Sequence, residues 1–247
     1  MTHRHPKTAV ATACVAALLA ACSAPLPREQ PLREVVKVST PKLAPGVREN
    51  SDELFVVVTF SGGGKRASAF SFGVLEALRE ISVTVPGGGK RPLLDEIDII
   101  SAVSGGAFTA AYYAMHGYDS FEHYPARFLE HDTAAAIRRL LFSPANWPRL
   151  MTSKVSRSDL AVEYLDREIF GHATVADLIA RSPRVIVTAT DLVRAAPFAF
   201  TREQMNGVCM DPASVPLARA VFASADTPIY FAPLVMRNFA EIGRAHV

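Results

Sequence analysis

The chain of 247 residues is poor in cysteine, with three, and it has no large excess of charge, with 26 basic and 24 acidic residues. Two of the basic residues, Arg4 and Lys7, lie in a segment that we expect to be removed, and without them the two signs balance. Nucleic-acid-binding proteins need a basic patch or stripe, so this composition argues against nucleic acid as a partner. Because 49% of the residues are hydrophobic and 20% are charged, a packed globular core is expected instead.

The three cysteines cannot form a disulfide within the mature protein. Cys14 falls in the expected signal segment and Cys22 in an expected lipidation site, which leaves Cys209 alone. The core must therefore stabilise the fold without covalent links. We expect Cys209 to be a buried, unreactive thiol.

The N-terminal apolar stretch, residues 8–21, is too short to span a bilayer as a stable helix, and with its positive flank it is typical of a secretory signal. It ends at Cys22 in a sequence similar to the bacterial lipobox, in which the cysteine is acylated and becomes the first residue. We therefore expect a signal peptide over residues 1–21 and a lipid anchor on Cys22. Since Ser23 and not an aspartate follows, we expect the outer membrane of a Gram-negative bacterium, facing the periplasm. An ordinary signal peptide cleaved nearby is the alternative.

Composition divides the rest of the chain into three segments. Residues 22–53 are polar and rich in proline, which predicts an extended tether between the membrane and the domain. The α/β domain proper is expected over residues 54–240. The last six residues, 242–247, match what one reading frame of a common sequencing adapter encodes. We therefore expect the native sequence to end near Ala240 and residues 241–247 to be a non-native tail.

Hydrophobic patterns predict an α/β fold. Residues 54–60 form a continuous β-branched and aromatic run, typical of a strand buried on both faces, and a helix over 65–81 follows, with Phe70, Val74, Leu78 and Ile81 at helical spacing. Strands are also expected at 97–100, 184–189 and 197–201, and a loop at 86–89. Helices are expected at 105–116 and 217–224, and the segment 118–171 is expected to be mostly helical. Strand and helix alternate at first, which implies a parallel sheet with right-handed crossovers and, later, a helical insertion.

Two turns between a strand and a helix carry the chemistry. Ala102-Val103-Ser104-Gly105-Gly106 has the small residues that a nucleophile elbow needs, with Ala102 where the usual pattern has glycine and Gly106 at its end. Gly62-Gly63-Gly64 also stands between a strand and a helix, where backbone N–H groups can converge on an anion. Both turns fall at the carboxyl edge of a parallel sheet, where α/β proteins bind ligands. A nucleophile at Ser104 and an oxyanion hole at Gly62, Gly63 and Gly64 would suit acyl transfer.

Nucleotide binding is the competing interpretation of the glycine loop. A Walker loop is excluded, because neither Lys65 nor Lys90 is followed by serine or threonine. A dinucleotide fingerprint fits Gly62, Gly64 and Ala67 but requires an acidic residue at the end of the next strand, and that strand ends at Ser104 instead.

The sequence resembles the patatin-like phospholipases, specifically their bacterial lipoprotein branch. The resemblance extends over nearly all of 54–233. It is carried by the stretch 61–67 with its helix 70–78, by 94–98 leading to 101–106, and by 189–192, 223–225, Pro228 and 231–233. It implies a three-layer α/β sandwich with a mainly parallel central sheet, a Ser-Asp dyad, hydrolysis of fatty-acyl esters and no metal or other cofactor. It also implies that Ser104 is the nucleophile.

By the same resemblance the amides of the glycine loop form the oxyanion hole, Lys65 and Arg66 supply basic support, and Ala67 and Ala102 replace family glycines. The family's aspartate stands in an Asp-Gly turn, but this sequence has no Asp-Gly pair. Asp191, Asp211 and Asp226 do not match the position. A triad with His172 or His123 as the base is also conceivable, but neither histidine follows a recognisable strand end. We therefore expect the chain to be truncated, with its general base missing and little activity left.

The sequence thus predicts a lipid-anchored serine hydrolase that acts on membrane phospholipids or lysophospholipids. The alternative is a non-catalytic, lipid-anchored binding or scaffolding protein with the same fold. The insertion around Trp147 either touches the bilayer or is an ordinary packed segment. The oligomeric state is left open.

Overall fold

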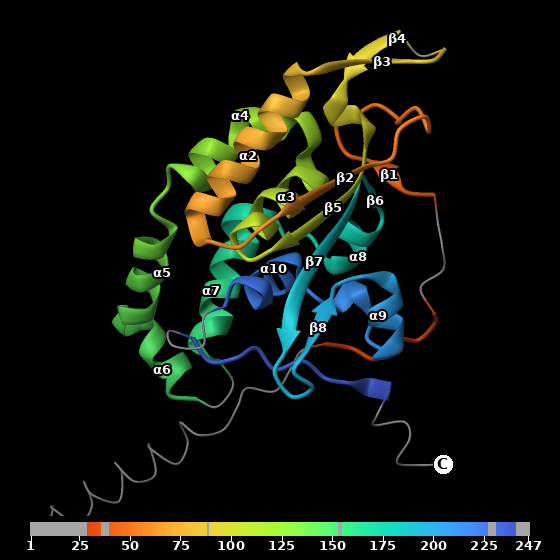
Figure 1. Cartoon of the computed structure of the whole chain (residues 1–247). Coiled ribbons are helices and arrows are strands. Elements are labelled where there is room, and N and C mark those ends of the chain that lie inside the picture. The colour runs from red at the N-terminus through yellow and green to blue at the C-terminus, as the bar shows by residue number, and fades with distance from the viewer. Residues whose placement is uncertain (1–28, 36–39, 88, 153–154, 227–230, 241–247) are drawn as a thin grey trace, which may run out of the picture.

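The computed structural model describes residues 29–35, 40–87, 89–152, 155–226 and 231–240. It is an α/β protein in which helices flank a mixed sheet with parallel strands, which confirms the predicted fold class (Figure 1). The central sheet has the strand order β2-β5-β7-β8, with bounds Val56–Phe60, Ile97–Val103, Arg184–Asp191 and Ala196–Ala199. The first three are parallel, and β8 is antiparallel to β7.

Helix α3 (Gly105–His116) follows β5 directly and lies at the centre of the core, with ten of its twelve residues buried. Helix α2 (Gly64–Glu80) follows β2 and packs along α3, while α10 (Leu217–Ala225) packs against β7. These three helices stand where the apolar patterns predict them. Two short helices, α8 (Val175–Ile179) and α9 (Arg202–Gly207), were not predicted.

The buried face of α2 differs from the predicted one. Phe70 is 76% exposed and Ile81 is 49% exposed, whereas Ser68 and Leu75 are fully buried. The cause is a close polar contact with α3, in which the Ser68 hydroxyl donates to the carbonyl of Gly105. The spacing of large apolar residues was therefore a poor guide, because the helices approach through small side chains.

Strand β2 is not buried on both faces as predicted. It is the edge strand of the described sheet, and Val57 on its outer face is 47% exposed. Phe55, just before the strand, is 75% exposed. A second difference is that the expected loop at 86–89 is the turn of a hairpin, whose strands β3 (Ser82–Val85) and β4 (Gly89–Pro92) were not predicted.

The middle of the chain is mostly helical, as predicted. Its main helices are α4 (Ser120–Tyr124), α5 (Thr133–Phe142), α6 (Trp147–Leu150) and α7 (Arg157–Leu165). Three large side chains on and beside α5 and α6 are exposed: Phe142, Trp147 and Met151. No helix in the described part of the chain is long and apolar enough to cross a membrane.

Much of the segment predicted as an extended tether packs onto the domain. Strand β1 (Lys42–Leu43) pairs in parallel with β6 (Arg181–Ser182), and Pro31 forms a β-bridge with Met210. The Leu32 amide also donates to the carbonyl of Cys209, 2.8 Å away. The packed structure therefore begins well before residue 54. Cys209 itself is half-buried, not buried as expected.

An ion cluster around Arg219 fixes the start of this segment. The Arg219 guanidinium pairs with Glu29 at 2.8 Å and with Asp159 at 3.0 Å, and it donates to the carbonyl of Val235. Burial alone would raise the pKa of Asp159, but hydrogen bonds from Ser156 and the charge of Arg219 lower it overall. Glu29 is only 3% exposed, so its carboxylate is held in place by this pairing.

Candidate active site

Ser104 lies in the turn that joins β5 to α3, with φ 54° and ψ −121°. This is the conformation of the first central residue of a type II′ turn, which favours glycine, so a serine there is strained. Strain of this kind persists only where the surrounding structure enforces it. The turn is the strand-to-helix elbow that the sequence predicted at this position.

Three close approaches, each at a glycine, shape the elbow. A Cβ on Gly62 would lie 3.1 Å from the Cβ of Ser104, and a Cβ on Gly105 would collide with the carbonyl of Gly64. At Gly106 a Cβ would lie 2.6 Å from the Cβ of Phe60. Glycine is therefore required where the loop after β2 meets the turn after β5, and Ser104 lies directly beside the glycine loop.

A hydrogen-bond relay holds the backbone of Ser104. Its N–H donates to Ser224 Oγ at 2.7 Å, and the Ser224 hydroxyl donates to the carbonyl of Thr188 on β7 at 2.6 Å. The relay ties the elbow to α10 and to the neighbouring strand. Ser224 lies in one of the stretches that carry the family resemblance, but no contact with Ser104 was predicted for it, because nothing in local spacing links residues 120 positions apart.

The glycine loop offers free N–H donors beside Ser104. Within the described part of the chain, no hydrogen bond occupies the N–H of Gly62 or Gly63. Helix α2 begins at Gly64 with no side-chain cap and no acidic residue in its first turn, and α3 begins at the elbow in the same way. Two helix N-termini, each with unpaired amides and a partial positive charge, thus meet at Ser104.

The two basic residues after the loop differ in their contacts. The Lys65 ammonium donates to the carbonyl of His131 and lies 5.9 Å from the ring centre of Phe128, so it holds the helical insertion. Arg66 is exposed on the first turn of α2 and makes no hydrogen bond or ion pair within the described residues. Of the two, only Arg66 is free to meet an anionic substrate group.

The Ser104 hydroxyl makes no hydrogen bond in the described part of the chain. Asp191 Oδ1 caps the turn after β7 by accepting from the N–H groups of Val193 and Arg194, and Asp211 caps a short 3₁₀ helix. Each of these two aspartates therefore stabilises a turn, which argues against a catalytic role for it. Both histidines considered as bases, His123 and His172, are exposed.

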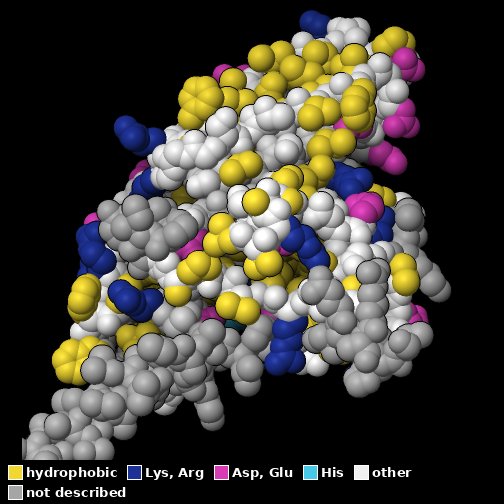
Figure 2. All heavy atoms as spheres, turned by 60° about the horizontal axis from the view of Figure 1, so that its bottom comes forward, with side chains coloured by type: hydrophobic (Ala, Val, Ile, Leu, Met, Phe, Trp, Pro, Cys, Tyr) yellow, Lys and Arg dark blue, Asp and Glu magenta, His cyan; other side chains and the backbone are white. Residues whose placement is uncertain are grey.

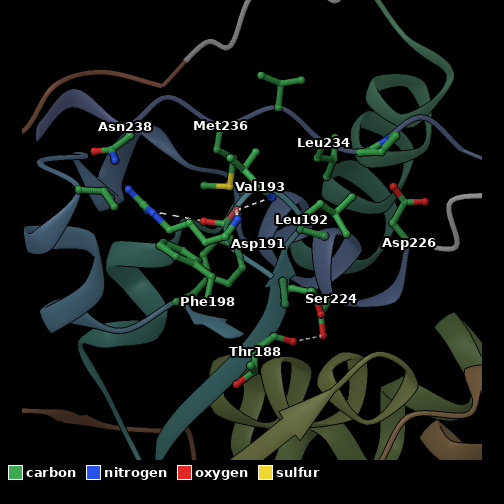
Figure 3. A pocket seen from close by; sticks show the side chains of 18 of the residues that line it. Thr188, Asp191, Leu192, Val193, Phe198, Ser224, Asp226, Leu234, Met236 and Asn238 are labelled. Atoms are coloured by element: carbon green, nitrogen blue, oxygen red, sulfur yellow. Dashed lines mark hydrogen bonds and ion pairs between the residues drawn. The ribbon is translucent and has the colours of Figure 1, made fainter. Parts of the chain in front are cut away.

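A cavity of about 530 Å³ lies beside the elbow and includes Val103 and Ser224 in its wall. Most of its wall is apolar, with side chains that include Phe198, Met210, Leu234 and Met236. Asp226 also lines it, and burial raises the pKa of this carboxyl above its ordinary value. Figure 3 shows Thr188 and Ser224 on one side of the cavity and Leu234 and Met236 on the opposite side. The described residues contain no cluster of potential metal ligands.

An α/β sheet with a strained serine at a strand-to-helix turn, next to a loop of free amides, is the arrangement of a serine hydrolase. The family model of the patatin-like phospholipases matches residues 58–238, which is most of the chain. The chain therefore belongs to the patatin-like phospholipase family, a family of lipid acyl hydrolases. A comparison with the curated proteins found no match.

Proposed function

We propose that the protein is a lipid-anchored serine acyl hydrolase that cleaves fatty-acyl esters of membrane phospholipids or lysophospholipids. The observation that carries the proposal is the strained Ser104, φ 54°, which lies between two uncapped helix N-termini. A structural serine has no need of such a conformation, whereas a nucleophile gains from it because the turn lifts its hydroxyl out of the sheet.

In the proposed reaction Ser104 Oγ attacks the ester carbonyl carbon and gives its proton to a general base. The amides of Gly62 and Gly63 donate to the oxyanion of the tetrahedral intermediate. The bond to the alcohol then breaks, the base returns the proton to the leaving oxygen, and water hydrolyses the acyl-enzyme. Removing a single oxyanion donor in such sites costs about 10²–10³ in kcat.

The base in this proposal is the aspartate of a Ser-Asp dyad. A carboxylate with an ordinary pKa of about 3.9 is a weak base, so the aspartate must be desolvated and bonded directly to the serine. None of the described carboxylates makes that bond. None of the described residues is therefore the general base.

The lipid anchor belongs to the same proposal. Acylated Cys22 would hold the protein on the outer membrane, facing the periplasm, where phospholipids are at hand. Two or three acyl chains anchor a protein firmly, since each buried methylene contributes about 0.8 kcal/mol. Cys22 lies outside the described residues.

Labelling with a fluorophosphonate probe tests the nucleophile in the full-length protein. We expect labelling that Ser104→Ala abolishes and that Ser82→Ala, an exposed serine on β3, leaves unchanged. Hydrolysis of a soluble short-chain ester should follow the same pattern. Labelling that survives Ser104→Ala would refute the assignment of the nucleophile.

One observation favours a second candidate function. Because the Ser104 hydroxyl has no base among the described residues, the protein also fits a non-catalytic, lipid-anchored scaffold. This alternative would be established if the full-length protein is folded but neither reacts with the probe nor hydrolyses the ester.

A further inference from the structure

The turn between β7 and β8 exposes large apolar side chains at the wall of the cavity. Leu192 is 61% exposed and Val193 is 95% exposed, and Val235 on the facing C-terminal segment is 44% exposed. All three line the cavity beside the elbow. We call Leu192, Val193 and Val235 the rim. Single exposed apolar residues are ordinary, but a group at the wall of an apolar cavity marks an interaction site.

The backbone of the turn is suited to an apolar environment. The N–H groups of Val193 and Arg194 both donate to Asp191 Oδ1, at 2.9 and 3.1 Å. Moving an unpaired amide from water into lipid costs several kcal/mol. The turn between β7 and β8 can therefore enter a membrane interface without leaving these two amides unpaired.

The position of the lipid anchor limits which face of the domain can meet the membrane. Glu29 is fixed by its ion pair with Arg219, and seven peptide steps separate it from Cys22. At about 3.6 Å per residue these steps span at most about 25 Å, whatever their conformation. A compact domain of this size is about 40 Å across. The anchor therefore cannot reach round to the far side of the domain.

The fixed end of the anchor segment lies beside the cavity. Pro31, two residues after Glu29, bridges to Met210, which also lines the cavity wall. In Figure 1 this segment runs at the same end of the molecule as the β7–β8 turn. Figure 2 views that end and shows hydrophobic side chains with Lys and Arg among them. Arg194 and Arg237 are at the cavity wall, and a cation near an anionic membrane contributes about 1 kcal/mol.

We propose that the rim rests in the interface of the bilayer that holds the anchor, so that the cavity opens toward the acyl chains of that bilayer. This inference rests on the proposed acylation of Cys22. The cavity then receives an acyl chain of a membrane lipid, and the ester end of that lipid meets the elbow. A volume of about 530 Å³ is within the range of pockets that enclose small ligands.

The test uses fluorescent labels on the full chain, acylated at Cys22 and placed in vesicles of phosphatidylethanolamine and phosphatidylglycerol. In a Cys209→Ser background, Val193→Cys carries an environment-sensitive fluorophore. Ile81→Cys is the matched control, because Ile81 is an exposed apolar residue next to the β3–β4 hairpin, at the opposite end of the molecule in Figure 1. Phe142→Cys on α5 reports on the other group of exposed apolar side chains, Phe142, Trp147 and Met151.

We expect quenching by phospholipids that carry nitroxide groups to be several-fold stronger at residue 193 than at residue 81, with a blue shift of the emission. Equal quenching at residues 193 and 81, or quenching at 142 without quenching at 193, overturns the proposal. Mass spectrometry that finds no acyl group on Cys22 also overturns it, by removing its premise. None of these readouts requires hydrolysis. Quenching at residue 193 can therefore be observed even if the fluorophosphonate probe does not label Ser104, and labelling of Ser104 can be observed without quenching at residue 193.

Discussion

The strain at Ser104 leads to a prediction about stability. A non-glycine residue held in this region of backbone space costs about 1–3 kcal/mol. Ser104→Gly removes that cost, while the greater freedom of glycine in the unfolded chain takes back about 0.4–1 kcal/mol. The net gain is about 0.5–2 kcal/mol, which raises Tm by about 1–8 °C for a domain of this size.

Ser104→Ala is the control that separates strain from the lost hydroxyl. Alanine keeps a Cβ and thus the strain, and the Ser104 hydroxyl makes no hydrogen bond whose loss would matter. We therefore expect Ser104→Ala to melt within about 2 °C of the parent. Both variants should lose all labelling by the fluorophosphonate probe. If thermal unfolding shows Ser104→Gly to be no more stable than Ser104→Ala, the elbow stores no strain and the reasoning fails.

Three further predictions concern the surroundings of the elbow. Ser224→Ala leaves the Ser104 N–H without its acceptor, so we expect a loss of about 1–3 kcal/mol in urea unfolding and slower probe labelling. Gly105→Ala places a methyl group against the Gly64 carbonyl and should destabilise by about 1–3 kcal/mol or more while abolishing labelling. Burial raises the pKa of Asp226, so its ionised form destabilises the fold; Asp226→Asn should therefore raise Tm at pH 7.

Each of these has its own control. Ser224→Thr keeps a hydroxyl and should recover part of the labelling rate, whereas equal loss in both variants would show that the hydrogen bond is unimportant. Gly73→Ala, in open space on α2, should stabilise by about 0.5–1 kcal/mol. The benefit of Asp226→Asn should shrink as the pH falls through the raised pKa and vanish below about 3.9, where the carboxyl is protonated in both states. A benefit that persists at low pH would mean another cause.

The sequence alone predicted the four strands of the central sheet and the two glycine-rich turns well, because apolar runs and strand-to-helix glycines are local signals. It did not predict which side of α2 is buried. Ser68 faces α3 because a small side chain allows the close contact, and hydropathy patterns cannot register this. Val57 was expected to be buried because an apolar strand looks the same at an edge as at the centre of a sheet.

Long-range contacts account for the remaining differences. The hydrogen bond from Ser104 to Ser224 joins residues 120 positions apart, and the pair Glu29–Arg219 joins two ends of the domain. A proline-rich stretch looks like a tether whether or not its backbone finds partners on a folded surface. The two turns of the candidate site could therefore be located from the sequence, but the contacts that hold their geometry could not.

The strain at Ser104 must be offset by something larger than the single hydrogen bond to Ser224, which contributes only about 0.5–1.5 kcal/mol. The free energy gained by packing α3 into the core is large enough. Ten of its twelve residues are buried, and burying one large apolar side chain such as Phe108 contributes about 1.5–3 kcal/mol. To relax Ser104, the first turn of α3 would have to move against the Gly64 carbonyl and the Cβ of Phe60, both of which lie against its glycines. The core therefore holds the elbow in place, and the hydrogen bond that the Ser104 N–H donates to Ser224 sets its final orientation.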